Sequence, residues 1–486
     1  MKSGKNSNHI TMANTLWRLA ERSSAKLVSF VVSVILARIL GPSVYGTVSL
    51  IIVIISVMQI FVDTGLTSAL VQKDSTDTLD FSTIFYFNLA VCILLYLIMY
   101  LSAPQIAAFF KNPEMTPMIR VLSLIILISG VRSVSQAFIV RNLMFRKFFF
   151  ATLTGTIISA FVGIYMAVSG CGVWALIVQH LVNLAVDTAF LWYITPFRPV
   201  RAFSVARLHA LASFGGRILI AELIERIYNN LRVIIIGRKF TKEDLAMYSK
   251  GRQFPEVIAG NINDSIDSVL FPIMAKAQND KEKMLELMKS SIQMSTFIIA
   301  PLMTGLFVTA PILVKLFLTD VWLPCVPYLR IFSFTFLLYP IHTVNLNAVK
   351  ALGRSDMLLK IEFLKKAYGL IILIITMQYS VLAIAAGVIL IGILGLFVNS
   401  YPNQQLTGYG LTKQFKDYMP AVLISFLMGV IITPLAYLNI PQAIILLLQI
   451  ILGGCSYLLL SKVFKIQAFA EMKDFIFNLK MSEDKQ

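Results

Sequence analysis

Ionisable side chains recur at helical spacing inside stretches of this chain that are otherwise apolar. Residues 214–237, FGGRILIAELIERIYNNLRVIIIG, are long enough to cross a bilayer, yet they contain several formal charges. One helix face collects four polar residues at spacings of 3, 4 and 3: Glu222, Glu225, Asn229 and Arg232. A charge at the centre of a membrane helix costs roughly 2.5–3.5 kcal/mol, so this face must meet protein or water instead of lipid.

The same pattern occurs on other apolar stretches. Residues at spacings of 3, 4, 3 and 4 form a second stripe: Gln253, Glu256, Gly260, Asn263 and Asp267. Further charges lie in the expected first, second and fourth spans, including Arg18, Arg22, Lys26, Asp63 and Arg132. Polar stripes on several helices predict a hydrated cavity between two helical bundles.

The cations in these stripes predict an anion-binding site. We expect substrate contacts from six of them: Arg22, Lys26, Arg132, Arg217, Arg226 and Arg252. Apart from Arg226, which is spaced to pair with Glu222, they have no obvious local partner. Arginine binds phosphate oxygens in a bidentate manner, and the neighbouring Asn, Gln and Ser side chains suit hydroxyl-rich groups such as sugars.

The acidic members of the stripes are candidates for ion coupling or gating: Asp63, Glu222, Glu225, Glu256 and Asp267. The alternative is that these charges form structural ion pairs. The four Cys and four His residues are dispersed and form no CxxC or Cys/His cluster, so we predict no metal, no cofactor and no catalytic residue.

Composition places the chain among polytopic membrane proteins. Of its 486 residues, 57% are hydrophobic and 14% are charged, against about 25% charged in soluble proteins. We expect about fourteen transmembrane helices: 16–39, 44–70, 81–103, 116–140, 148–168, 172–194, 211–237, 244–272, 290–318, 322–346, 357–378, 380–401, 418–437 and 440–462. The first, seventh and eighth are polar, and the last six are expected to be nearly uncharged at their centres.

Basic residues indicate the orientation. The net charge of +17 would suit nucleic-acid binding, but Lys and Arg lie mainly in short connections between apolar runs. This distribution argues against a nucleic-acid interface and matches an anionic cytoplasmic leaflet, which places both termini in the cytoplasm. The N-terminal segment is expected to remain in the protein, because charges interrupt what would be the apolar part of a signal peptide.

Two segments resemble each other and suggest a repeat. Residues 36–75 and 235–280 each contain a basic residue at a helix end, a short turn and a Tyr, followed 18 or 19 residues later by an Asp. We therefore expect an N-terminal six-helix lobe at 1–196, a basic linker at 197–210 and a second six-helix lobe at 211–402. Two additional helices at 403–463 and a cytoplasmic tail at 464–486 complete this division.

Four segments resemble one known family. They are ARILGPSVYG (37–46), VDTGLTSALVQ (62–72), MYSKGRQFPE (247–256) and VLFPIMAKAQND (269–280). They are similar to the Wzx-type polysaccharide exporters of the MOP superfamily, which also contains the multidrug-and-toxin-extrusion (MATE) antiporters and the lipid II flippase. The likeness is strongest to the colanic-acid and lipopolysaccharide exporter branch. Five residues match its first-hairpin motif, with an expected structural role: Arg38, Gly41, Pro42, Tyr45 and Gly46.

The resemblance implies an all-α MATE-like fold with two lobes in pseudo-twofold arrangement and a cationic central cavity. It implies a flippase of the bacterial inner membrane that moves an undecaprenyl-diphosphate-linked oligosaccharide to the periplasmic leaflet by alternating access. Expected partners are the lipid-linked oligosaccharide, membrane lipids, a polysaccharide polymerase and a chain-length regulator. Two alternatives stay open, a MATE-type drug/cation antiporter and a membrane polysaccharide polymerase. The glycan, the coupling ion and the oligomeric state are not readable from the sequence.

Overall fold

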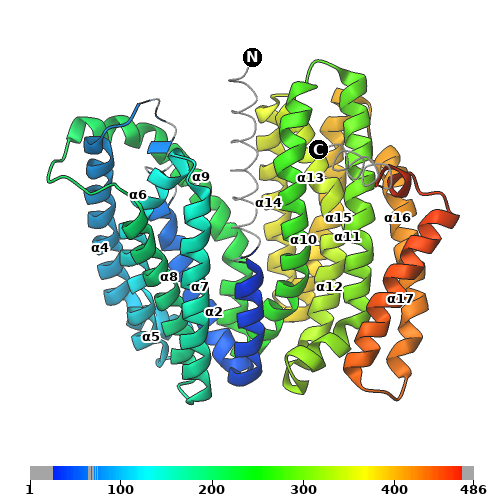
Figure 1. The fold of residues 1–486 in the computed structure, drawn as a ribbon, viewed down its shortest axis with the longest axis horizontal. Helices are drawn as coiled ribbons and strands as arrows, with labels where there is room; N and C mark the ends of the chain where they lie inside the picture. Colours follow the sequence, from blue (N-terminus) through cyan, green and yellow to red (C-terminus); the bar gives the residue numbers. More distant parts are fainter. Residues whose placement is uncertain are drawn as a thin grey trace, which may run out of the picture. The chain divides into compact units, whose positions relative to one another are not determined.

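The computed structural model describes residues 24, 26–63, 67, 70–71, 73 and 75–472. Every regular element in this part of the chain is a helix, as the sequence predicts (Figure 1). Ten helical segments are long and apolar enough to cross a membrane. The protein is therefore an integral membrane protein of the all-α class.

The expected count of about fourteen spans is not confirmed. The long helices α9, α10 and α14 are outside the group of ten, and polar or charged side chains interrupt all three. The first expected span, 16–39, lies partly outside the described residues. Charge on α14 also corrects the expectation that the last six helices are uncharged at their centres, because Lys360, Glu362, Lys365 and Lys366 lie within it.

The chain forms two compact units that divide after Ala246. Unit 1 contains helix 26–40, α2 (Pro42–Asp63), α4 (Thr78–Phe109), α5 (Met115–Leu122), α6 (Leu124–Arg141), α7 (Phe145–Val168), α8 (Val173–Ile194) and α9 (Val205–Lys239). The sequence placed α9 in the second lobe. In the structure it packs on α2 and α4 and so belongs to unit 1.

Unit 2 begins within α10 (Lys242–Lys276). It continues with α11 (Lys281–Phe317), a 3-10 turn (Asp320–Cys325), α12 (Val326–Leu337), α13 (Tyr339–Ala351), α14 (Ser355–Thr376), α15 (Val381–Thr407), α16 (Leu411–Ile432), a second 3-10 turn (Thr433–Tyr437) and α17 (Gln442–Val463). The last two membrane-length helices expected from the sequence correspond to α16 and α17.

Helix ends follow local sequence. Asp77 caps α4 by accepting a hydrogen bond from the Asp80 backbone N–H, and the Asp80 carboxylate accepts one from the Asp77 backbone N–H. Ser380 caps α15 in the same way through the N–H of Ala383. Gly408 ends α15 with φ of +76°, a left-handed conformation that favours glycine.

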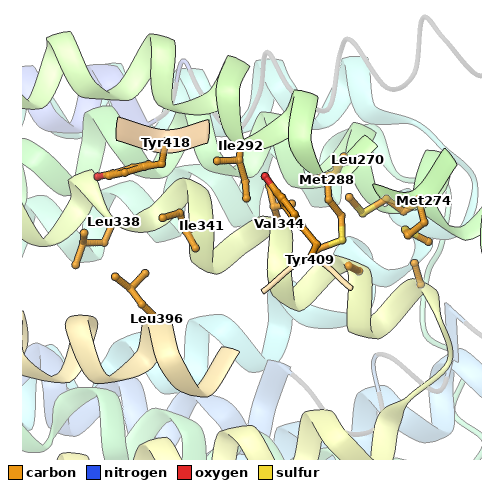
Figure 2. Packing of buried hydrophobic residues seen from close by; sticks show 13 residues of the cluster. Leu270, Met274, Met288, Ile292, Leu338, Ile341, Val344, Leu396, Tyr409 and Tyr418 are labelled. Atoms are coloured by element: carbon orange, nitrogen blue, oxygen red, sulfur yellow. The ribbon is translucent and has the colours of Figure 1, made fainter. Parts of the chain in front are cut away.

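Each unit has apolar clusters of its own. In unit 1, Phe81, Val134 and Phe197 join α4, α6 and the segment after α8. In unit 2, Met274 of α10, Met288 of α11 and Val344 of α13 lie in one cluster with Tyr409 and Tyr418 (Figure 2). This packing fixes the helix faces from which the polar side chains below project.

Candidate functional site

A buried ion pair links α6 to α8 inside unit 1. Arg132 Nε lies 2.8 Å from Asp187 Oδ2, and the two side chains are 22% and 5% exposed. Glycine makes this close packing feasible, because a Cβ on Gly155 of α7 would lie 2.9 Å from the Asn183 carbonyl oxygen and 3.2 Å from Asp187 Cβ. The sequence offered Arg132 as a cation without a local partner, and the partner that it has lies 55 positions further along the chain.

Asp187 was not among the acidic residues singled out as ion-coupling candidates. A signal was present, since Gln179, Asn183 and Asp187 recur every four residues in a mostly apolar helix. Two of these residues face neighbouring helices. Asn183 donates hydrogen bonds to Ser159 and Thr156 of α7, and Asp187 meets Arg132.

The other predicted cations have varied surroundings. Arg252 pairs with Glu256 one turn along α10 at 2.9 Å, so this arginine has a local partner, contrary to expectation. Arg226 is exposed and forms no ion pair with Glu222, although the structure describes both side chains. Lys26 lies in helix 26–40 and has an interaction partner. Arg22 and the side chain of Arg217 lie outside the described part of the chain.

The predicted acidic residues also have different partners. Glu225 accepts a hydrogen bond from Asn229 at 2.9 Å. Asp267 accepts one from the buried Asn347 at 2.6 Å, and one turn away Thr343 donates to Asn263 at 2.6 Å. These two bonds form a polar ladder between α10 and α13. The side chain of Asp63 lies outside the described residues.

The motif around residues 37–46 forms the turn between helix 26–40 and α2. Gly41 has φ of +74°, and Pro42 begins α2, where its missing N–H costs nothing. The Tyr45 hydroxyl donates to the Ser33 carbonyl at 2.8 Å. A Cβ on Gly46 would lie 2.0 Å from the Lys242 carbonyl oxygen, so only glycine fits there. Arg38 has an interaction partner as well.

A second charge cluster ties α9 to the start of α4. The buried Asp80 carboxylate accepts hydrogen bonds from Lys73 at 2.7 Å and from Arg207 at 3.1 Å. Arg207 also pairs with Asp77, and this hydrogen bond, with the Asp80 N–H, lowers the pKa of Asp77 to about 2. Nearby, Arg141 donates to the Leu70 carbonyl at 2.9 Å. We call Lys73, Asp77, Asp80 and Arg207 the α4–α9 clasp.

Sequence reasoning also missed polar groups inside unit 2. Lys365 and Lys366 lie 2.9 and 3.9 Å from Glu362 on α14. A buried amide network joins α13, α15 and α16 through Asn345, Asn403 and Gln414. Asn345, Asn403 and Gln414 lie on three different helices among other polar residues, so only the packing of these helices shows that they meet. The residues described by the structure contain no group of three His, Cys, Asp or Glu that could hold a metal ion.

Comparison with known proteins adds the family. The model of the polysaccharide biosynthesis protein family matches residues 35–327, which is more than half of the chain. The chain belongs to this family. The match begins within helix 26–40 and ends early in α12, so it includes the Arg132–Asp187 pair and the α4–α9 clasp.

Three proteins are similar to this chain in sequence. The succinoglycan biosynthesis transport protein ExoT of Rhizobium meliloti is 27% identical over 60% of this chain, and the alignment spans 59% of that protein. The teichuronic acid biosynthesis protein TuaB of Bacillus subtilis is 24% identical over 77% of this chain and 78% of its own. The lipopolysaccharide biosynthesis protein WzxC of Escherichia coli is 23% identical over 82% of this chain and 83% of its own length.

Solved structures show the same fold. A structure of the lipid II flippase MurJ matches 93% of this chain and 98% of its own, with a TM-score of 0.76 and 16% identity. An inward-facing MATE multidrug transporter of the MOP superfamily matches 80% of this chain and 96% of its own, with a TM-score of 0.61 and 15% identity. The protein therefore has the MATE-like transporter fold that the sequence predicts.

Proposed function

We propose that the protein is a flippase for an undecaprenyl-diphosphate-linked oligosaccharide repeat unit. It moves this lipid from the cytoplasmic to the periplasmic leaflet of the bacterial inner membrane. The observation that carries the proposal is membership of a polysaccharide biosynthesis family by a chain with a membrane transporter fold. The name of the Rhizobium meliloti relative, which includes transport, supports it.

Chemistry at the cations supports the anionic substrate. A diphosphate is doubly suited to arginine, because its oxygens match the guanidinium fork and its charge offsets the cost of a cation in the membrane. We propose that Arg132 and Arg252 contact this group, together with Arg22, Lys26, Arg217 and Arg226. The glycan occupies a hydrated cavity while the prenyl chain stays in lipid.

Alternating access supplies the movement. In our proposal the two bundles rock about the bound substrate, so that the cavity opens first to the cytoplasm and then to the periplasm. The termini lie in the cytoplasm, in keeping with the distribution of Lys and Arg. A cytoplasm-negative potential favours outward movement of an anion by about 2.3 kcal/mol per charge per 100 mV. A polymerase and a chain-length regulator would use the translocated product.

Reconstitution tests the proposal directly. Purified protein in liposomes should expose a fluorescent undecaprenyl-diphosphate oligosaccharide to an impermeant quencher faster than protein-free liposomes do. The charge-reversal variant Arg252→Glu, inserted at the same level, should lose this activity. Unchanged lipid distribution with correctly folded wild-type protein would refute the flippase assignment.

One alternative has support from the fold. The likeness to a MATE transporter is compatible with drug or cation antiport. That function predicts export of organic cations from intact cells, whereas the surplus of Arg and Lys repels such substrates. Joining of repeat units in the same liposomes would instead indicate the polymerase alternative.

A further inference from the structure

The Arg132–Asp187 pair leaves half of the arginine unused. Its Nε lies 2.8 Å from Oδ2, but the Nε–H does not point along the line to that oxygen. The two terminal Nη groups have no acceptor in the described part of the chain. The Arg132 side chain is 22% exposed and lies beside the Phe148 ring. Its fork can therefore receive another anion without first breaking the contact with Asp187.

The carboxylate is also incompletely satisfied. Asp187 Oδ1 is buried and accepts no hydrogen bond, and the buried hydroxyl of Thr152 on α7 next to it has no partner either. The Thr152 O–H can donate to Oδ1 when Asp187 is ionised, and the acid O–H can donate to the Thr152 oxygen when Oδ1 carries a proton. This pair of oxygens therefore accommodates either protonation state of Asp187.

In the described part of the chain, α2, α5, α6 and α7 pack against α8. Helix 26–40 also packs against it, because Val32 and Leu36 share a cluster with Ala175 and Leu176, and this helix carries Lys26 and Arg38. From α6 the facing charge is Arg132, and from α7 the facing polar group is Thr152. The charged residues of α7, Arg146 and Lys147, lie in its first turn, and Arg120 of α5 donates to the Tyr100 carbonyl. Residues 42–62 of α2 carry no charge, and the other titratable groups on α8 are His180, about two turns away, and Tyr193, six residues further along the helix.

The pair lies well inside the membrane-length helices. Arg132 is nine residues before the end of α6, and Asp187 is seven residues before the end of α8. At 1.5 Å per residue they are roughly 14 and 11 Å from those ends. A single cation at that depth cannot neutralise two anions, so a second anion on Arg132 favours the protonated form of Asp187.

We propose that Arg132 and Asp187 form a proton-linked phosphate site. A phosphate group takes the Nη fork of Arg132, and Asp187 Oδ1 gains a proton from water as it does so. When the phosphate leaves, the proton returns to water and the Arg132–Asp187 charge pair is restored. The inference rests on the proposed function in that it assigns the phosphate to the lipid-linked substrate, and it makes Asp187 the proton-coupling residue.

Calorimetry on the full-length protein in lipid nanodiscs tests it. Undecaprenyl diphosphate is titrated at pH 8 in HEPES and in Tris, whose different protonation enthalpies report the protons exchanged. The wild type should take up close to one proton per ligand, and its affinity should fall as pH rises. Asp187→Asn should take up almost none and show a flat pH profile. Arg132→Gln should lose at least about tenfold in affinity, the factor expected for one charged hydrogen bond.

Two further variants serve as controls for this experiment. Asp320→Asn removes the carboxylate of the exposed Lys315–Asp320 pair and should behave as wild type. The double variant Arg132→Gln/Asp187→Asn removes both charges of the pair and leaves neither one without a partner, so it should fold even if Asp187→Asn does not. It should lose both affinity and proton uptake.

Failure of this inference and failure of the flippase assignment are distinguishable. Binding by the wild type without proton uptake, or equal uptake by Asp187→Asn, overturns the proton link and leaves the flippase intact. Inorganic pyrophosphate, titrated in the same way, tests the site without the lipid. Pyrophosphate binding with Asp187-dependent uptake, but no lipid flipping, supports the site and refutes the flippase. Binding of neither probe refutes the phosphate site.

Discussion

Replacing Asp80 with asparagine should destabilise unit 1 while preserving the shape of the side chain. The Asp80 carboxylate is 2% exposed. It accepts hydrogen bonds from Lys73 at 2.7 Å, from Arg207 at 3.1 Å and from the Asp77 N–H at 3.2 Å. Breaking a buried ion pair costs about 3–5 kcal/mol. Because Lys73 and Arg207 are 38% and 34% exposed, water retains part of their solvation, and we expect a loss of about 2 kcal/mol.

A loss of this size is measurable as thermal unfolding. For a unit of this length it lowers Tm by about 4–8 °C. The assay is intrinsic fluorescence of purified protein heated in detergent. Asp356→Asn is the matched control, because Asp356 forms a similar 2.9 Å pair with Arg354 but is 53% exposed. Its Tm should stay within about 1–2 °C of wild type.

Equal Tm values for the two variants would refute the reasoning. That result would mean that the α4–α9 clasp does not hold α9 to unit 1, in spite of the distances within it. A large effect at Asp80 should also disappear at high salt less readily than any effect at Asp356, since burial protects the pair from screening.

Three further predictions follow from the same geometry. The folded pKa of Asp77, about 2, is below its ordinary value of 3.8, so its stabilising contribution is complete above about pH 4 and is lost as pH falls towards 2; Asp77→Asn should flatten Tm measured across pH 2–5. Gly155→Ala should destabilise by about 1–3 kcal/mol through its clash with α8, whereas Gly216→Ala, with open space within 4 Å, should stabilise by about 0.5–1 kcal/mol; chemical unfolding that ranks them otherwise would contradict the packing. Arg252→Gln should leave Tm nearly unchanged, because its pair with Glu256 is 35% and 48% exposed, but should reduce lipid flipping in liposomes; full transport would remove Arg252 from the proposed phosphate contacts.

Some of this protein could be read along the chain. Apolar length and the rarity of charge predict membrane helices because a bilayer requires every backbone group to be satisfied within the helix. The turn at Gly41 and Pro42 is local, so its residues are recognisable in sequence. The family resemblance rests on the same short segments, and the family match covers them.

Pairing across the bundle could not be read in this way. Arg132 seemed to lack a partner because Asp187 is on another helix, and ridge packing of α6, α7 and α8 decides that they meet. Arg207 of α9 reaches Asp80 for a similar reason, which places α9 in unit 1 and not in the second lobe. The count of fourteen spans included the polar helices α9, α10 and α14, and the partners of their charged residues are visible only in the folded structure.

Sequence alone therefore determined the membrane class, the helical fold and the presence of buried charge, because each follows from local solvation and helical periodicity. The tertiary structure decided which charges neutralise one another and which of the paired side chains stay partly exposed, as Arg132 does. These properties depend on distances between residues far apart in the chain, and helix packing sets those distances.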